Sequence, residues 1–319
     1  MLLEKIMIIS ASRRTDIPAY YSDWFFNRIK EKYVLVRNPM NIRQVSKISL
    51  SREVCDGIVF WTKNPLPMMS RLDEISEYPY YFQFTLNAYD NDIEKRLPSK
   101  SDVLIPAFIK LADMIGKERV IWRYDPILFN KKYTPDYHIK YFEMLVQRLC
   151  GYTEKCTVSF LDNYRSINKN MKILNVSDIS DSEKYDLIGR MAQTAKRYGI
   201  YIETCAEAAD FTNLGVGKAS CIDAERLGKI GGVRLKSQKD KNQRKECGCT
   251  ESIDIGTYNT CRNGCMYCYA NHSDKLICSN VKRYNAMSEL LCGEVGTDDI
   301  VIERSVKSLR ECQTSFFGK

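Results

Sequence analysis

The 319-residue sequence predicts an α/β fold, a full or partial (β/α) TIM-type barrel with a C-terminal cysteine-rich extension. Short apolar and aromatic runs alternate with helix-period segments at spacings of about 22 to 45 residues, as the strand–helix units of a parallel sheet require. The runs are almost continuously apolar, which is typical of strands that are covered on both faces. The alternation spans about 235 residues, close to the roughly 250 of a typical barrel.

Seven runs have the length and composition of strands. An eighth is expected near Gly215–Asp223 or Val233–Leu235. An open doubly wound sheet is the alternative fold, although no glycine-rich phosphate fingerprint follows the first run. The seven predicted strands are Ile6–Ser10, Tyr33–Arg37, Ile58–Thr62, Tyr80–Leu86, Arg119–Tyr124, Thr157–Leu161 and Ile200–Thr204.

Three helices between these strands have readable ends. Asp16 is the expected N-cap of the first, and Pro18 lies in its first turn. Thr134 caps a second helix, which runs to Cys150 and stops at Gly151. Ser180 and Glu183 form a capping box for a third, which ends at 198–199.

The alternating pattern stops near Ser237, so we expect a barrel over residues 1–236 and an extension over 237–319 that packs on it. Helices are expected in the tail, over Val281–Leu291 and Asp298–Leu309. The basic run Lys229–Lys245 is interpreted as a solvated loop, with contact to a polyanion as the alternative. The sequence has no apolar run of about 18 residues and no signal peptide, so we expect a cytoplasmic protein.

Polar side chains follow most of the predicted strands, where a barrel has its active site. Arginine suits carboxylate or phosphate, so a ligand with an anionic group is expected. The alternative is that these charges pair with one another and close the rim. The candidates for catalysis or substrate binding are Arg13, Arg14, Asp16, Lys63, Arg123 and Asp125, and those for cofactor binding include Asn38 and Glu203.

Thirteen cysteines are too many for an ordinary reduced protein, and six lie between Cys247 and Cys278. Thiols clustered in a reducing compartment are more often metal ligands than disulfides. Cys261, Cys265 and Cys268 have the spacing C-x3-C-x2-C, and Gly264 permits the tight turn. A [4Fe–4S] cluster held by three thiolates leaves one iron open. Zinc is the alternative, with His272 as its fourth ligand.

This cysteine motif, with Tyr267 before its last cysteine, resembles the signature of the radical S-adenosylmethionine (SAM) superfamily. The fragment from Cys265 to Ala270 is similar to members near the spore photoproduct lyase-like branch. Nearly the whole chain resembles the uncharacterised family DUF1848, on the motifs Ser10–Pro18, Val59–Pro65, Trp122–Pro126 and Asp254–Tyr258.

The resemblance implies a radical SAM enzyme of unknown substrate that cleaves SAM reductively at a [4Fe–4S] cluster. An electron donor such as flavodoxin or ferredoxin would be its partner, and the backbone of Tyr267 would contact the adenine of SAM. One departure stands out. In the superfamily at large the cysteine loop follows the first barrel strand, whereas here it comes after the whole strand–helix pattern.

Four further cysteines are candidates for a second centre, an auxiliary cluster or zinc: Cys205, Cys221, Cys247 and Cys249. Otherwise they are buried or exposed free thiols. Two other functional classes stay open. One is an iron–sulfur protein that only transfers electrons, and the other is a zinc-stabilised protein that binds nucleic acid through Lys229–Lys245.

Overall fold

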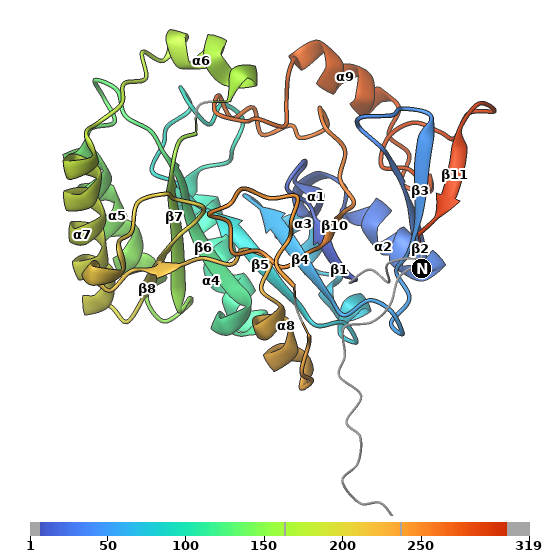
Figure 1. The fold of residues 1–319 in the computed structure, drawn as a ribbon, viewed down its shortest axis with the longest axis horizontal. Helices are drawn as coiled ribbons and strands as arrows, with labels where there is room; N and C mark the ends of the chain where they lie inside the picture. Colours follow the sequence, from blue (N-terminus) through green and yellow to red (C-terminus); the bar gives the residue numbers. More distant parts are fainter. Residues whose placement is uncertain (1–6, 163, 237, 305–319) are drawn as a thin grey trace, which may run out of the picture.

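The computed structural model describes residues 7–162, 164–236 and 238–304, and its centre is an eight-stranded sheet (Figure 1). Every neighbouring pair in this sheet is parallel. In spatial order the strands are β10 (Ile253–Asp254), β1 (Ile8–Ala11), β4 (Gly57–Thr62), β5 (Tyr80–Thr85), β6 (Val120–Ile127), β7 (Lys155–Phe160), β8 (Tyr201–Thr204) and β9 (Gly217–Lys218).

The α/β class predicted from the sequence is therefore confirmed, but the sheet is not a closed barrel. Among the described residues, β10 and β9 form its two ends and do not pair with each other. Six of the seven predicted strands lie in this sheet, and the two-residue β9 lies within Gly215–Asp223, where an eighth strand was expected.

The predicted second strand is formed but belongs elsewhere. Tyr33–Arg37 is β2, which pairs antiparallel with β3 (Gln44–Ser49) in a separate three-stranded sheet. The connection between them, residues 38–43, is long enough for a hairpin but too short for the crossover that parallel strands need. The third strand of this sheet is β11 (Ile300–Glu303), parallel to β3.

The helices begin where the sequence places capping residues. The side chains of Asp16, Thr134 and Ser180 each accept a backbone hydrogen bond at a helix N-terminus, and Ser180 and Glu183 complete the capping box. The helices are α1 (Ile17–Tyr20), α2 (Ser22–Glu31), α3 (Leu66–Met69), α4 (Ile105–Ile115), α5 (Pro135–Leu149), α6 (Asn168–Ile173), α7 (Asp181–Arg197), α8 (Ala224–Gly231) and α9 (Asp274–Lys282).

The two faces of the large sheet pack against different parts of the chain. Side chains alternate along each strand, so Phe60 and Phe82 join a core with α2, α4, α5 and α7. Val59 and Tyr81 point the other way, into a smaller cluster with Leu227 of α8 and with cysteines of the segment 219–249. We call this second side the inner face of the sheet. The helices α4, α5 and α7 lie together beside the strands in Figure 1.

The tail differs from the prediction of two helices. Residues 281–291 form only the end of α9 followed by turns, and Asp298–Leu309 begins with β11, its residues 305–309 lying outside the described part. Ile300–Ile302 are apolar and β-branched, which suits a strand more than a helix. In the part of the chain that the structure describes, no helix is both long and apolar enough to cross a membrane.

Candidate functional site

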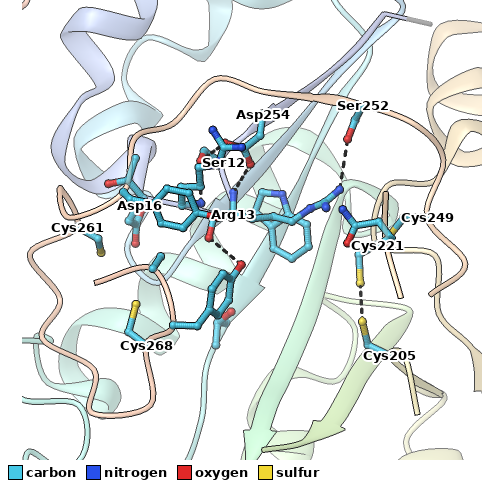
Figure 2. Close-up of a pocket in the computed structure, with 18 of the residues that line it drawn as sticks. Ser12, Arg13, Asp16, Cys205, Cys221, Cys249, Ser252, Asp254, Cys261 and Cys268 are labelled. Atoms are coloured by element: carbon cyan, nitrogen blue, oxygen red, sulfur yellow. Dashed lines mark hydrogen bonds and ion pairs between the residues drawn. The ribbon is translucent and has the colours of Figure 1, made fainter. Parts of the chain in front are cut away.

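A cavity of about 790 Å³ opens at the carboxyl ends of the parallel strands. Its walls come from the segments after β1, β4, β6, β7 and β8 and from residues 240–270 (Figure 2). All but one of the predicted site residues line it. These are Arg13, Arg14, Asp16, Asn38, Lys63, Arg123, Asp125, Cys205, Cys221, Cys247, Cys249, Cys261, Cys265, Tyr267 and Cys268.

Glu203 is the exception, because it does not line the cavity. Its carboxylate pairs with the ammonium group of Lys155 on the neighbouring strand β7. Asn38 lines the cavity from the connection between β2 and β3, where its side chain donates to Gln44 Oε1 (2.9 Å). Arg14 lies over the ring of Tyr258 and donates to the carbonyl of Gly256 (3.4 Å).

Asp254, at the end of β10, fixes the chain that leaves β1. Its carboxylate accepts hydrogen bonds from the hydroxyls of Ser10 (3.0 Å) and Ser12 (2.7 Å) and from the backbone N–H of Arg13 (2.8 Å). Gly256 follows closely, and a Cβ atom there would lie 1.9 Å from Ser12 Oγ. The Asp-Ile-Gly motif therefore serves close backbone packing between two distant parts of the sequence.

Asp16 joins three parts of the site. Besides capping α1, its buried carboxylate accepts from Thr62 Oγ1 (2.7 Å), the Lys63 N–H (2.8 Å) and Asn263 Nδ2 (3.1 Å). Burial raises the pKa of Asp16, against the lowering effect of these hydrogen bonds. With its acceptor positions used in this way, Asp16 is placed to position the cysteine loop.

The cysteine loop, residues 259–271, starts five residues after β10 and is anchored on both sides. Tyr21 donates to the carbonyl of Thr260 and Tyr20 to Asn263 Oδ1, both at 2.6 Å. On the other side, the N–H of Met266 donates to the carbonyl of Ile93 (2.9 Å). Gly264 has φ +69°, so the positive angle that the sequence analysis anticipated at this turn is present.

A buried carboxylate links the cysteine loop to two lysines. Glu94 is 1% exposed and binds the ammonium groups of Lys63 (2.8 Å) and Lys100 (2.7 Å). The hydroxyl of Tyr267 donates to the same carboxylate, and Lys63 lies 5.5 Å from the centre of the Tyr267 ring. Lys63 is thus held by the same carboxylate that binds Tyr267 of the loop.

The three loop thiols face the cavity and act on one another electrostatically. Burial raises the pKa of Cys261, Cys265 and Cys268. His272, the proposed fourth zinc ligand, is exposed and stacks on Tyr258 instead of lining the cavity. The loop therefore brings three thiols to the cavity, and His272 is not among the side chains that line it.

The inner face of the sheet supplies a second group. Arg123, 4% exposed, donates to Asp125 Oδ2 (2.8 Å) and to Cys221 Sγ (2.8 Å). Two guanidinium groups lie near the Trp61 ring, that of Arg123 at 5.0 Å and that of Arg13 at 5.8 Å from its centre. The indole N–H of Trp61 is buried without a hydrogen-bond partner among the described residues.

The other four cysteines also meet at this face. The thiols of Cys205 and Cys221 lie 3.3 Å apart, and side-chain hydrogen bonds continue from Cys221 to Cys249 and from Cys249 to Cys247. Within the described residues, no group of three or more Cys, His, Asp or Glu side chains is arranged to hold a metal ion. Both sets of thiols line the same cavity, but neither surrounds a common point.

Sequence reasoning missed three residues of this site. Glu94 lies in the connection between β5 and α4, away from a strand end. Lys100 belongs to the same connection, but Lys63 and Tyr267 come from other parts of the chain. Asp254 was noticed only as part of a motif, because its two-residue strand is too short to detect. Trp61 stands at an alternate position of β4, so period-2 analysis would have placed it on the same face as Val59.

These features define an α/β protein with a cysteine-lined polar cavity at the carboxyl edge of a parallel sheet. The chain matches the family model described as a domain of unknown function (DUF1848) over residues 8–270, and it therefore belongs to that family. The matched region contains the large sheet and both sets of cysteines. No curated protein shows a significant match to this chain.

Proposed function

We propose that the protein is a radical SAM enzyme whose open-site [4Fe–4S] cluster is held by Cys261, Cys265 and Cys268. The observation that carries the proposal is the position of the loop. It follows β10, which is late in sequence but forms the end of the large sheet beside β1, where the succession of strands begins. A cysteine loop after the first strand of a parallel sheet is the arrangement that the superfamily resemblance implies, so the change of sequence position preserves the spatial relation. We treat the open sheet as a partial (β/α) barrel.

The donor set fits such a cluster. Three thiols from one loop face a cavity, and His272 is turned away from it. The cavity volume of about 790 Å³ lies within the roughly 300–1,000 Å³ of sites for small molecules. Such a cluster, when bound, supplies the electron that cleaves SAM to methionine and a 5′-deoxyadenosyl radical, which abstracts a hydrogen atom from the substrate.

The protein residues divide into two roles in this proposal. Asp16 and Lys63 position the loop, Asp16 through Asn263 and Lys63 through Glu94 and Tyr267. Arg14 and Asp125 line the cavity with part of their side chains exposed, 23% and 21%. They are placed to bind polar or charged groups of SAM or of the substrate.

The structure offers less support for the other two functional classes. Electron transfer alone does not require a cavity of this size beside the thiols. In the basic run Lys229–Lys245, Lys229 pairs with Glu225, Arg244 pairs with Asp162, and Lys239 donates to a nearby carbonyl. These three side chains already have partners, and Lys229 lies within α8, so the run offers less to a nucleic acid than its sequence indicates.

The test is formation of 5′-deoxyadenosine by anaerobically reconstituted protein supplied with SAM and a strong reductant. The wild type is expected to form it, and Cys268→Ala is expected to lose both the iron and the product. Cys55→Ala is the matched control, since Cys55 is buried in the helix-side core and lies away from the cavity. Wild-type protein with a full complement of cluster that forms no 5′-deoxyadenosine would refute the proposal.

A further inference from the structure

The structure points to a second metal centre, in which Cys205, Cys221, Cys247 and Cys249 together supply four thiolates. We infer that this centre has a complete protein ligand set, with no position left for substrate. We refer to these residues as the thiol quartet. The inference does not depend on the chemistry proposed for the cysteine loop.

The first argument is proximity of residues that are far apart in sequence. The quartet joins the end of β8, the segment before α8 and the segment 247–249, and all four side chains line the inner side of the cavity. Figure 2 shows Cys205, Cys221 and Cys249 at one side of the view and Cys261 and Cys268 at the other, with Arg13 between them. The two sets of cysteines therefore form separate sites within one cavity.

The second argument is charge. Arg13 is partly buried, and its Nε is buried with no hydrogen-bond partner among the described residues. Ser252 Oγ accepts from Arg13 Nη2 at 3.3 Å. The groups whose negative charge would act on the guanidinium are Cys249, Asp254, Tyr269 and Cys221, and two of these four belong to the quartet. A partly buried cation is stabilised by negative charge beside it, and a metal bound by four thiolates would add such charge.

Arg123 provides a second positive charge at the quartet. It donates to Cys221 Sγ at 2.8 Å while it also binds Asp125. The guanidinium therefore lies where the sulfur of a metal-bound Cys221 would accept its hydrogen bond, as an outer-sphere partner does. Arg123 of β6 and Arg13 of the segment after β1 therefore both lie near the quartet. Four neutral thiols would not need two positive charges beside them, whereas a negatively charged metal–thiolate centre would be stabilised by them.

The third argument concerns spacing and the kind of metal. Zinc–thiolate bonds of about 2.3 Å in a tetrahedron place two sulfurs about 3.8 Å apart. The 3.3 Å between Cys205 and Cys221 is near that value, and a four-iron cube separates its thiolates much more widely. The thiols form a chain and not a tetrahedron, so binding would draw Cys247 toward Cys205. In the net reaction, Zn²⁺ and four thiols give a tetrathiolate complex of charge −2 and release four protons.

Such a centre would fix the segment 247–249 on the inner face of the sheet. Gly248 permits this approach, because a Cβ atom there would lie 2.9 Å from the carbonyl of Ala219. The cysteine loop begins a short distance further along the same chain. The quartet would therefore stabilise the wall from which the loop extends.

The test uses the full chain with Cys261, Cys265 and Cys268 all changed to Ala, which removes the proposed cluster and leaves the quartet. After anaerobic purification, zinc and iron are measured per chain. One equivalent of zinc is expected, and Cys249→Ala in this background should abolish it, whereas Cys55→Ala should not. An iron–sulfur absorption spectrum retained by the triple variant would support a four-thiolate centre but replace the single ion with a cluster.

Cobalt substitution provides a second measurement that does not depend on activity. Co²⁺ added to the metal-free triple variant should give the intense visible and near-ultraviolet bands of tetrathiolate coordination. Arg13→Gln should weaken metal binding about tenfold or more, as loss of an outer-sphere partner typically does, and Arg13→Lys should restore part of it. A triple variant with native circular dichroism that binds neither zinc, iron nor cobalt would overturn the inference, whether or not wild-type protein cleaves SAM.

Discussion

Replacing Glu94 by Gln removes a single negative charge from beneath the cysteine loop. The carboxylate is 1% exposed and binds Lys63 at 2.8 Å and Lys100 at 2.7 Å, while Tyr267 donates a hydrogen bond to it. Glutamine keeps the shape of the side chain but leaves two ammonium groups facing a neutral amide. Breaking a buried ion pair by removing one partner typically costs about 3–5 kcal/mol.

The pKa of Glu94 leads to a similar magnitude. Burial raises this pKa, but Lys63 and Lys100 more than offset the effect and lower it to about 2 from an ordinary value of 4.5. A difference of this size corresponds to about 3 kcal/mol of folding free energy. Because the folded-state pKa is below the unfolded one, the contribution is complete above pH 4.5 and is lost as the pH falls toward 2.

Urea denaturation followed by tryptophan fluorescence measures the effect. At pH 7, Glu94→Gln should lower the free energy of unfolding by about 3–5 kcal/mol, and the difference from wild type should shrink below pH 4.5. Glu74→Gln is the matched control, since Glu74 also binds two cations, Arg71 and Lys30, but at the surface. Its effect should stay below about 1 kcal/mol. A Glu94 variant as mild as the Glu74 control would refute the reasoning.

Three further predictions concern other parts of the fold. Burial lowers the pKa of His138 to about 4, so the unfolded chain takes up a proton first as pH falls; wild type should lose about 3 kcal/mol between pH 6.5 and 4, measured by denaturation and compared with His138→Gln. Gly256→Ala places a methyl group against Ser12 and should cost about 1–3 kcal/mol and release cluster iron, whereas Gly189→Ala in α7, at 3.6 Å from Leu214, should not. Asn263→Ala removes a donor to Asp16 and should lower the iron retained per chain after gel filtration without unfolding the protein.

The sequence predicted local structure better than the relation between distant segments. Asp16, Thr134 and Ser180 are caps whose action is confined to one helical turn, and the structure confirms all three. Tyr33–Arg37 was correctly predicted as a strand but was wrongly placed in the large sheet. Its partner is β3, which follows after a short connection, and β11 completes the small sheet on the other side of β3. Neither neighbour is visible in the composition of β2 itself.

In the candidate site, too, local patterns were predicted better than contacts between distant segments. Strand-end reasoning brought Arg13, Arg123 and Asp125 to one cavity, because parallel strands end at the same edge of a sheet. The same reasoning included Glu203, which pairs with Lys155 at a neighbouring position instead. Glu94 and Asp254 were beyond its reach. Their roles arise from contacts across more than 150 residues of sequence, with Tyr267 and with Ser12 respectively, and no local pattern records such contacts.

The electron paramagnetic resonance spectrum of the reduced, reconstituted protein, recorded with and without SAM, tests the central claim most directly. Three thiolates from Cys261, Cys265 and Cys268 leave one iron open, so SAM should change the spectrum of the reduced [4Fe–4S] cluster in wild-type protein. Zinc in the thiol quartet gives no paramagnetic signal, so the Cys261/Cys265/Cys268 triple variant should show none. A fully loaded wild-type cluster whose spectrum is the same with and without SAM would contradict the account.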